Sequence, residues 1–147
     1  GTGNARSMLD SADAWVPRRR SGQWMQLDLG APTNVFGVVT QGRTSADEWV
    51  RSFLVNYSSD GRKWYRVGFF WGNHDRNTHV TARIHHVTAR YVRIIPRDVQ
   101  RWPSLRAAVL TCEAEQACLP GPVLNVPESK RTYSTVWLNS SRGTGYA

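Results

Sequence analysis

A chain of 147 residues has the length of one globular domain, and its 40% hydrophobic content is sufficient for a buried core. Its apolar residues occur in short runs, which excludes a stretch of the length that spans a membrane. The formal net charge of +8 includes the run Arg18-Arg19-Arg20. This charge indicates an anionic partner such as nucleic acid, a sulfated glycan or an acidic lipid, or else a solvated basic surface.

Almost no segment has helical periodicity, and alternation of apolar and polar residues predicts a series of strands. In chain order they cover residues 24–29, 35–40, 52–58, 64–68, 79–84, 89–96 and 105–112. Asp60-Gly61 stands between two of these patterns and predicts a hairpin. Seven or so short strands separated by turn signals are typical of an all-β sandwich or jelly roll.

The character of the sequence changes after Cys118. Residues 119–122 (LPGP) form a turn-rich link, and residues 130–137 (KRTYSTVW) predict one more strand that leads into a final loop. The two ends of the chain are similar: residues 1–5 read GTGNA and residues 143–147 read GTGYA. We therefore expect both ends to belong to the same loop of a repeating unit.

No catalytic set is suggested by spacing. His85 and His86 are adjacent on a predicted strand, so their side chains point to opposite faces and cannot share a ligand. Asp47-Glu48 is expected to be a solvated turn. Cys112 and Cys118 cannot form a four-ligand zinc site, which leaves a disulfide or two free thiols. The sequence predicts that the protein is not an enzyme.

Several segments, taken in order, match a known family. They are residues 14–17 (AWVP), 23–30 (QWMQLDLG), 40–43 (TQGR), 49–53 (WVRSF), 57–64 (YSSDGRKW), 72–78 (GNHDRNT), 89–96 (ARYVRIIP), 104–106 (SLR) and Cys112. In this order the chain resembles the discoidin domain, also called the coagulation factor 5/8 type C domain, over nearly its whole length. The resemblance implies an all-β, discoidin-like β-sandwich of the jelly-roll type, formed by a single domain over residues 1–147.

The order of the segments departs from the family in one respect. The family's domain begins with a cysteine, a PLG segment, a strand and the first loop, which resemble residues 118–122 (CLPGP) and 132–137 (TYSTVW) at the other end of this chain. The resemblance therefore implies a circularly permuted domain with its termini in the first ligand loop. Residues 1–112 are then the body and residues 118–147 a displaced N-terminal segment. A window across two tandem repeats and a strand-swapped copy are the alternatives.

The resemblance also bears on the cysteines and on metals. The first and last cysteines of the family's domain pair, which implies a disulfide between Cys112 and Cys118. Related sugar-binding sandwiches often hold a structural calcium with acidic residues near their start and end. Asp10 or Asp13 could serve, but the usual late glutamate is Ala108 here. We expect no metal site and no cofactor, with calcium as the open alternative.

In discoidin-like domains the loops at one end of the sandwich hold the ligand. By position these loops are residues 136–147 with 1–4 across the termini, 42–48, 70–76 and 99–103. The ligand-binding candidates in them are Trp137, Leu138, Arg142, Arg43, Asp47, Trp71, His74, Arg76, Arg101 and Trp102. The remaining tryptophans fall on family-typical positions and are expected in the core: Trp15, Trp24, Trp49 and Trp64.

This mixture of side chains suits two kinds of ligand. A sugar would stack on an aromatic ring and take hydrogen bonds from arginine, aspartate, asparagine and histidine. An acidic membrane would accept Trp137-Leu138 as an apolar wedge, with arginines on the phosphates. We expect a secreted, extracellular recognition or adhesion module that binds cell-surface glycans as lectins do.

Two alternatives from other functional classes stay open. One is peripheral binding to anionic, phosphatidylserine-type membranes, and the other is a structural repeat of a secreted adhesive or matrix protein. The overlapping ends fit tandem copies or a homo-oligomer. Nucleic-acid binding is disfavoured because the basic residues are spread over the strands. The expected disulfide and the sequons at Asn56 and Asn139 also indicate an extracellular protein.

Overall fold

The computed structural model of the chain describes residues 6–111 and 123–137. These residues form an antiparallel β-fold, which confirms the predicted all-β sandwich. Its elements are β1 (Met25–Gln41), β2 (Trp49–Val50), β3 (Ser52–Ser58), β4 (Tyr65–Trp71), β5 (Val80–Pro96), β6 (Val99–Gln100), β7 (Arg106–Thr111), β8 (Val123–Leu124), the short 3-10 helix η2 (Glu128–Lys130) and β9 (Arg131–Tyr133). No helix among the described residues is long and apolar enough to cross a membrane.

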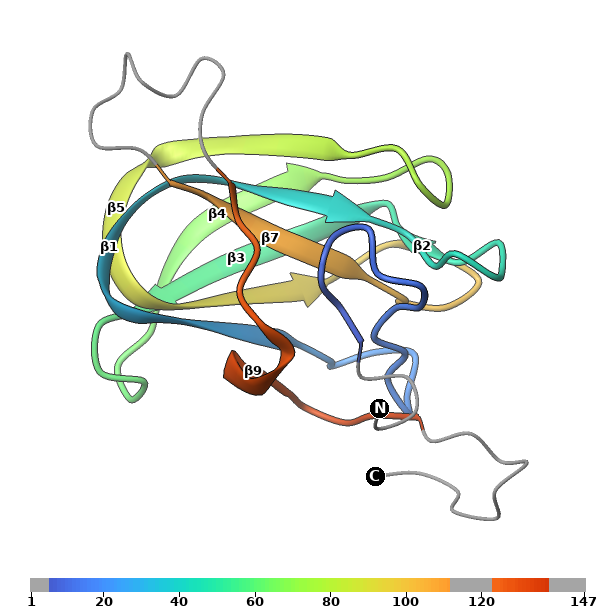
Figure 1. Cartoon of the computed structure of the whole chain (residues 1–147), viewed down its shortest axis with the longest axis horizontal. Coiled ribbons are helices and arrows are strands. Elements are labelled where there is room, and N and C mark those ends of the chain that lie inside the picture. Colours follow the sequence, from blue (N-terminus) through green and yellow to red (C-terminus); the bar gives the residue numbers. More distant parts are fainter. Residues whose placement is uncertain (1–5, 112–122, 138–147) are drawn as a thin grey trace.

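Two long strands, β1 and β5, bend and take part in both layers of the sandwich (Figure 1). The first part of β1 pairs with the end of β5 and with β9, whereas its second part pairs with the start of β5 and with β7. The pairing of β1 with β5 shifts register between Asp28 and Thr33, where the strands bend. Strands β3 and β4 extend the first layer, and β8 extends the second.

The predicted strands were correct in place but wrong in number. Residues 24–29 and 35–40 are one strand, as are residues 79–84 and 89–96, because pairing resumes beyond each bend. Gly30 and Pro32 signal a turn in the sequence, but they lie in the bend. The Asp60-Gly61 hairpin is confirmed, and β4 continues past the predicted end at residue 68 as far as Trp71.

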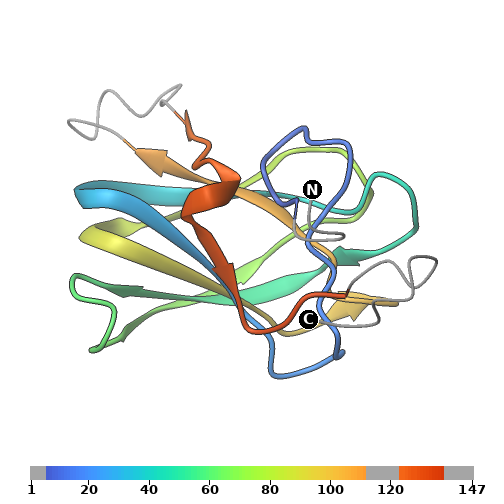
Figure 2. The ribbon, with the colours of Figure 1, turned by 60° about the horizontal axis from the view of Figure 1, so that its bottom comes forward.

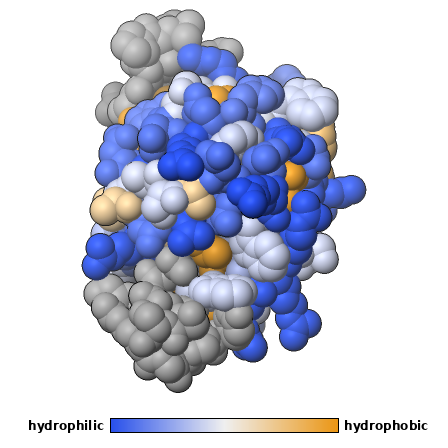
Figure 3. Space-filling view, turned by 90° about the vertical axis from the view of Figure 1, so that its right-hand side faces the viewer, coloured by the Kyte–Doolittle hydropathy of each residue, from blue (hydrophilic) through white to orange (hydrophobic). Residues whose placement is uncertain are grey.

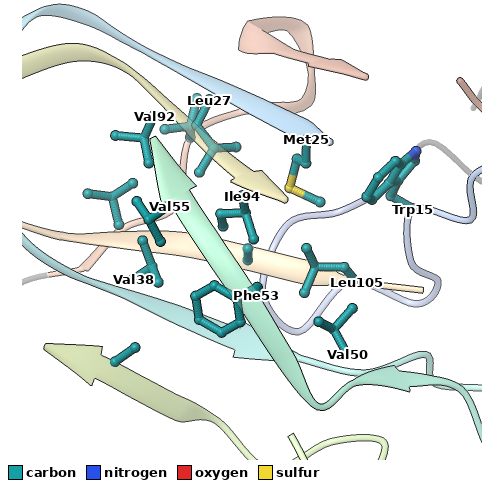
Figure 4. Packing of buried hydrophobic residues seen from close by; sticks show 14 of the residues in the cluster. Trp15, Met25, Leu27, Val38, Val50, Phe53, Val55, Val92, Ile94 and Leu105 are labelled. Atoms are coloured by element: carbon teal, nitrogen blue, oxygen red, sulfur yellow. The ribbon is translucent and has the colours of Figure 1, made fainter. Parts of the chain in front are cut away.

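The core lies between the two layers, as Figure 4 shows. Alternation places Phe53 and Val55 of β3 inward, on the same face of the first layer as Met25 and Leu27 of β1, and all four side chains are fully buried. Burial of each such side chain contributes about 1.5–3 kcal/mol to stability. Burial in the core therefore explains why apolar and polar residues alternate along these strands.

The segment 123–137 is part of the same folded unit as residues 6–111 (Figure 2). Strand β9 pairs with the start of β1, and Val126 joins the core. Tyr133 stacks on Trp15 with ring centroids 5.5 Å apart, and Trp15 Nε1 donates to Thr135 O over 2.7 Å. Removal of this segment would expose the end of the core around Trp15.

Two predictions concern parts of the chain outside the described residues. The Cys112–Cys118 disulfide and the shared loop of the two ends fall there, so both stay predictions. The circular permutation and the division into a body and a displaced segment also stay predictions. The strand predicted over residues 130–137 is shorter than expected, because only Arg131–Tyr133 pairs with β1.

Candidate ligand-binding site

Loops from distant parts of the chain meet at one end of the sandwich, on the right of Figure 1. They are residues 6–18, 42–48, 72–79 and 101–105, together with residues 134–137 after β9. Figure 3 shows this end of the molecule, where most of the coloured surface is hydrophilic. Surface loops carried on a rigid sheet are the usual place for binding residues.

The buried guanidinium of Arg106, the first residue of β7, holds three of these loops in place. Its Nε donates to Gly42 O over 2.8 Å, its Nη1 to Ser11 O over 3.0 Å and its Nη2 to Arg76 O over 2.8 Å. Burial lowers the pKa of Arg106 from its ordinary value, and the charges of nearby carboxylates oppose that shift. Arginine keeps its charge in proteins, so the carbonyl oxygens face a fixed cation.

Close packing at Gly42 brings the loop 42–48 against the loop 72–79. A β-carbon at this position would lie 2.8 Å from Asp75 O and 2.8 Å from Trp49 Cβ. Gln41, just before it, is buried and donates from Nε2 to Asn77 O over 2.7 Å. Both residues belong to the TQGR segment, which therefore fixes the spacing between two binding loops.

The first hollow at this end, which we call the tryptophan hollow, has a volume of about 330 Å³. The Trp102 and Trp137 rings lie edge to face, with centroids 6.2 Å apart. Trp102 Nε1 donates to Pro17 O over 2.7 Å, and Trp137 N donates to Val16 O over 2.6 Å. The hollow is lined by Val16, Arg43, Glu48, Trp102 and Trp137.

Arg43 and Glu48 give the tryptophan hollow its polar groups. Arg43 Nη1 donates to Glu48 Oε1 over 3.1 Å, and the same oxygen accepts from Ser104 Oγ over 2.7 Å. Arg43 Nε is buried, lies 3.7 Å from Asp13 Oδ1 and has no hydrogen-bond acceptor among the described residues. A buried donor without an acceptor is costly.

A second hollow of about 370 Å³ lies on the other side of the loop 42–48 and is more polar. Arg76 Nε donates to Asp47 Oδ1 over 2.8 Å. Thr78 donates from both its backbone N and its hydroxyl to Asp75, which lowers the pKa of that carboxyl. Its lining is Asp47, Trp49, Asp75, Arg76, Asn77 and Thr78.

The structure divides the predicted ligand residues into groups. Arg43, Trp102 and Trp137 line the first hollow, whereas Asp47 and Arg76 line the second. Trp71 is 69% exposed at the end of β4, edge-on to Phe69, and is not in either hollow. The others are placed as follows: His74 is exposed in the loop 72–79, Arg101 is exposed beside Trp102, and Leu138 and Arg142 lie outside the described residues.

Two residues that line the tryptophan hollow were missed from the sequence. Glu48 was assigned with Asp47 to a solvated turn, and that assignment is wrong for Glu48, which is half-buried and paired with Arg43. Val16 gave no polar signal. Glu48 follows Arg43 by five residues, and this spacing was the signal in the sequence that could have suggested the pair. In the structure the backbone of the loop pairs as well, because Arg43 N donates to Glu48 O.

The expected core role is confirmed for Trp15 and wrong for Trp24 and Trp64. These two rings lie on the outer face of the sheet, where the Arg93 guanidinium carbon sits 4.1 Å from each centroid. Cation–π contacts of this kind stabilise a sheet surface without burial in the core. Trp49 lines the second hollow.

The carboxylates considered for calcium have other partners. Asp10 Oδ1 lies 2.9 Å from His79 Nε2 and accepts from Gln41 Nε2 over 3.2 Å, and these contacts lower the pKa of Asp10. Asp13 lies beside Arg43. Calcium takes six to eight oxygen ligands. Within residues 6–111 and 123–137 no three metal-binding side chains gather, so these residues do not fit a calcium site.

Known proteins are similar to this chain in sequence. The family model described as "F5/8 type C domain" matches residues 1–109. Coagulation factor VIII of Sus scrofa is 37% identical over 113 residues, which cover 70% of this chain and 5% of that protein. Neuropilin-2 of Rattus norvegicus is 32% identical over 134 residues, which cover 75% of this chain and 14% of that protein. The chain thus spans a small part of these relatives.

Solved structures share the fold. Discoidin II of Dictyostelium discoideum superposes with a TM-score of 0.68 at 24% identity, over 78% of this chain and 51% of that one. CBM32 of AlyQ, in complex with 4,5-unsaturated mannuronic acid, superposes with a TM-score of 0.51 at 17% identity, over 74% of this chain and all of the other. At these identities the likeness shows the fold alone.

Proposed function

Because the chain belongs to the F5/8 type C domain family, we propose that it is an extracellular recognition module that binds cell-surface glycans in the tryptophan hollow. The family consists of binding modules, so the chain acts by recognition and not by catalysis. Factor VIII and neuropilin-2 are secreted or face the outside of the cell, which supports the proposed extracellular location.

The observation that carries this proposal is the pairing of aromatic faces with charged hydrogen-bonding groups in one hollow. A sugar ring has an apolar C–H face, which packs on an aromatic ring such as Trp102 or Trp137. Its hydroxyls both donate and accept, and thus match the Arg43 donors and the Glu48 acceptor. A volume of about 330 Å³ is at the lower end of ligand sites, which suits a short stretch of sugar.

One structural neighbour supports the same class of ligand by analogy. CBM32 of AlyQ was solved with a bound sugar acid on the same fold. Fold likeness alone does not carry function, so the proposal rests on the residues of the hollow.

The expected apolar wedge of the membrane alternative consists of Trp137 and Leu138, of which the structure describes Trp137. An apolar wedge would project from the surface, but Trp137 lies in the hollow, with its backbone N bound to Val16 and its ring against Trp102. The hydrophilic character of this end in Figure 3 also favours a polar ligand over lipid tails. A structural role as one repeat of an adhesive protein is compatible with glycan binding and stays a separate prediction.

The proposal is tested by a glycan array with the wild-type chain and the variants Trp102→Ala and Trp137→Ala. Loss of one stacking ring should weaken binding about tenfold or more, since aromatic anchors contribute about 2 kcal/mol at binding sites. Trp71→Ala is the matched control, because Trp71 is exposed outside the hollow, and it should bind as the wild type does. Equal binding by all four proteins contradicts the site, and binding only to phosphatidylserine vesicles contradicts the ligand class.

A further inference from the structure

We infer that the tryptophan hollow selects an anionic glycan, whose sulfate or carboxylate groups are bound by arginines of the run 18–20 and by Arg101 at the rim of the hollow. This inference rests on the proposed function and specifies its ligand. The net charge of the chain is +8, and neutral-glycan binding in the hollow gives no role to this charge. Part of it lies in the run Arg18-Arg19-Arg20, which is outside every described strand.

Backbone and side-chain contacts place this run beside the two tryptophans. Trp102 Nε1 donates to Pro17 O over 2.7 Å, directly before the run. Arg18 N donates to Thr135 Oγ1 over 2.9 Å, two residues before Trp137. The basic run therefore crosses between the chain segment that carries Trp102 and the segment that carries Trp137.

Arg101 joins the same rim from the other side. Arg20 Nε donates to Arg101 O over 3.0 Å, so the two residues are in contact. Arg101 has a φ of 65°, a conformation that residues other than glycine adopt infrequently. Its side chain and those of residues 18–20 are all exposed to solvent. Strain at a non-glycine residue next to Trp102 is consistent with a role for this turn in binding.

The charges around the two hollows differ in sign. The tryptophan hollow is lined by one arginine and one carboxylate, Arg43 and Glu48, which pair with each other, and four more arginines lie in the chain segments next to it. The second hollow has two carboxylates, Asp47 and Asp75, and one arginine, Arg76. An anionic group is thus attracted to one side of the loop 42–48 and not to the other. The arginines in the segments next to the tryptophan hollow are Arg18, Arg19, Arg20 and Arg101.

The chemistry of the rim suits sulfate and carboxylate groups. A guanidinium presents parallel N–H donors that match two oxygens of such a group, and these charge-assisted hydrogen bonds are stronger than neutral ones. A neutral glycan would gain nothing from a rim of arginines. A glycan with an acidic group would be bound by stacking in the hollow and by ion pairs at the rim.

The test compares four probes by titration calorimetry: a heparin-derived tetrasaccharide, its desulfated and N-acetylated counterpart, neutral N-acetylchitotetraose, and single-stranded polyuridylate. The test variant combines Arg19→Gln with Arg101→Gln. It removes two rim charges, and residue 101 stays a non-glycine residue, as in the wild type. The matched control is Arg62→Gln with Lys63→Gln, which removes two exposed charges from the β3–β4 hairpin at the opposite end of the sandwich (Figure 1).

We expect the wild type to bind the heparin tetrasaccharide more tightly than any of the other probes. The rim variant should raise the Kd for the heparin tetrasaccharide about tenfold. The hairpin variant should leave this Kd unchanged. Raising NaCl from about 50 mM to about 500 mM should weaken wild-type binding and reduce the difference between wild type and rim variant, since salt screens exposed charges.

Three results would overturn the inference. They are equal affinity of the wild type for the heparin and the neutral tetrasaccharide, an equal loss in the rim and hairpin variants, and binding of single-stranded polyuridylate as tight as that of the heparin tetrasaccharide. Failure of the proposed function would give a different result from these three. If the inference alone is wrong, the glycan array still shows neutral ligands that depend on Trp102, whereas an array without any ligand contradicts glycan binding itself.

Discussion

The Arg131 guanidinium lies in the interior, where it donates to the carbonyl oxygens of three separate segments. Its Nε donates to Val126 O over 2.7 Å, and its Nη1 donates to Ser7 O over 2.6 Å and to Ala107 O over 2.7 Å. Burial lowers the pKa of Arg131, and the Glu128 charge opposes that shift. The side chain is therefore a fixed cross-link between the segment 123–137, β7 and the start of the described chain.

Arg131→Met should keep the volume of the side chain and remove its donors. The carbonyl oxygens it serves would stay buried without partners, so we expect the free energy of unfolding to fall by about 3 kcal/mol. Urea unfolding followed by circular dichroism measures this. Arg62→Met, on the exposed hairpin, is the control and should change stability by less than about 0.5 kcal/mol. Similar stability of the two variants would show that Arg131 is not a cross-link.

The β3–β4 hairpin is held by one carboxylate. Asp60 Oδ1 accepts from Lys63 N over 3.0 Å, from Arg62 N over 2.8 Å and from Ser58 Oγ over 3.1 Å. The two backbone hydrogen bonds, with that of the Ser58 hydroxyl, lower the pKa of Asp60 to about 2. They explain why an Asp-Gly pair at this place forms the turn that its sequence predicts.

The hairpin should therefore respond to acid. A carboxyl whose pKa is lower in the folded state than its unfolded value of about 3.9 contributes stability above that pH, and the contribution is lost as pH falls toward 2. An NMR titration of the Asp60 carboxyl carbon should give a pKa near 2. Asp60→Asn should remove this part of the pH dependence of unfolding. A measured pKa near 4 would contradict the hydrogen-bonded turn.

The segment 123–137 is an element on which the sandwich depends, although the family model matches only residues 1–109. It supplies β9, which pairs with β1, and the Tyr133 ring, which stacks on Trp15. Ser7 N also donates to Glu128 Oε1 over 2.6 Å. The start and the end of the described chain therefore stabilise each other.

A chain that ends at residue 111 should lose cooperative unfolding, because Trp15 would be exposed and residues 25–27 of β1 would lose their pairing with β9. Thermal unfolding followed by tryptophan fluorescence compares it with the full chain. Addition of a peptide with residues 118–147 should restore the transition in part. A truncated chain with the same unfolding midpoint as the full chain would show that the segment is dispensable.

The sequence was most informative where neighbours along the chain decide the structure. Alternation located Phe53 and Val55 in the core, and Asp60-Gly61 located the hairpin. Contacts between distant residues could not be predicted in this way. The bend of β1 beyond Gly30 depends on pairing with β5, and the Arg43–Glu48 pair lines a hollow only because Trp102 and Trp137 come to it from other loops.

The whole molecule has two different ends. One is closed by the bends of β1 and β5 and the hairpin, and the other gathers the loops that Arg106 holds together (Figure 1). At the loop end, the tryptophan hollow and the second hollow lie on either side of residues 42–48 and differ in charge. The proposed anionic glycan would therefore bind with its acidic groups toward Arg101.

The most direct test of the central claim is an NMR titration of the tryptophan indole N–H signals with the glycan that binds most tightly on the array. Glycan recognition in the tryptophan hollow predicts that the signals of Trp102 and Trp137 shift with the same Kd, while those of Trp71 and the buried Trp15 stay in place. The largest shifts at Trp71, with Trp102 and Trp137 unchanged, would place the ligand on β4 and contradict the account.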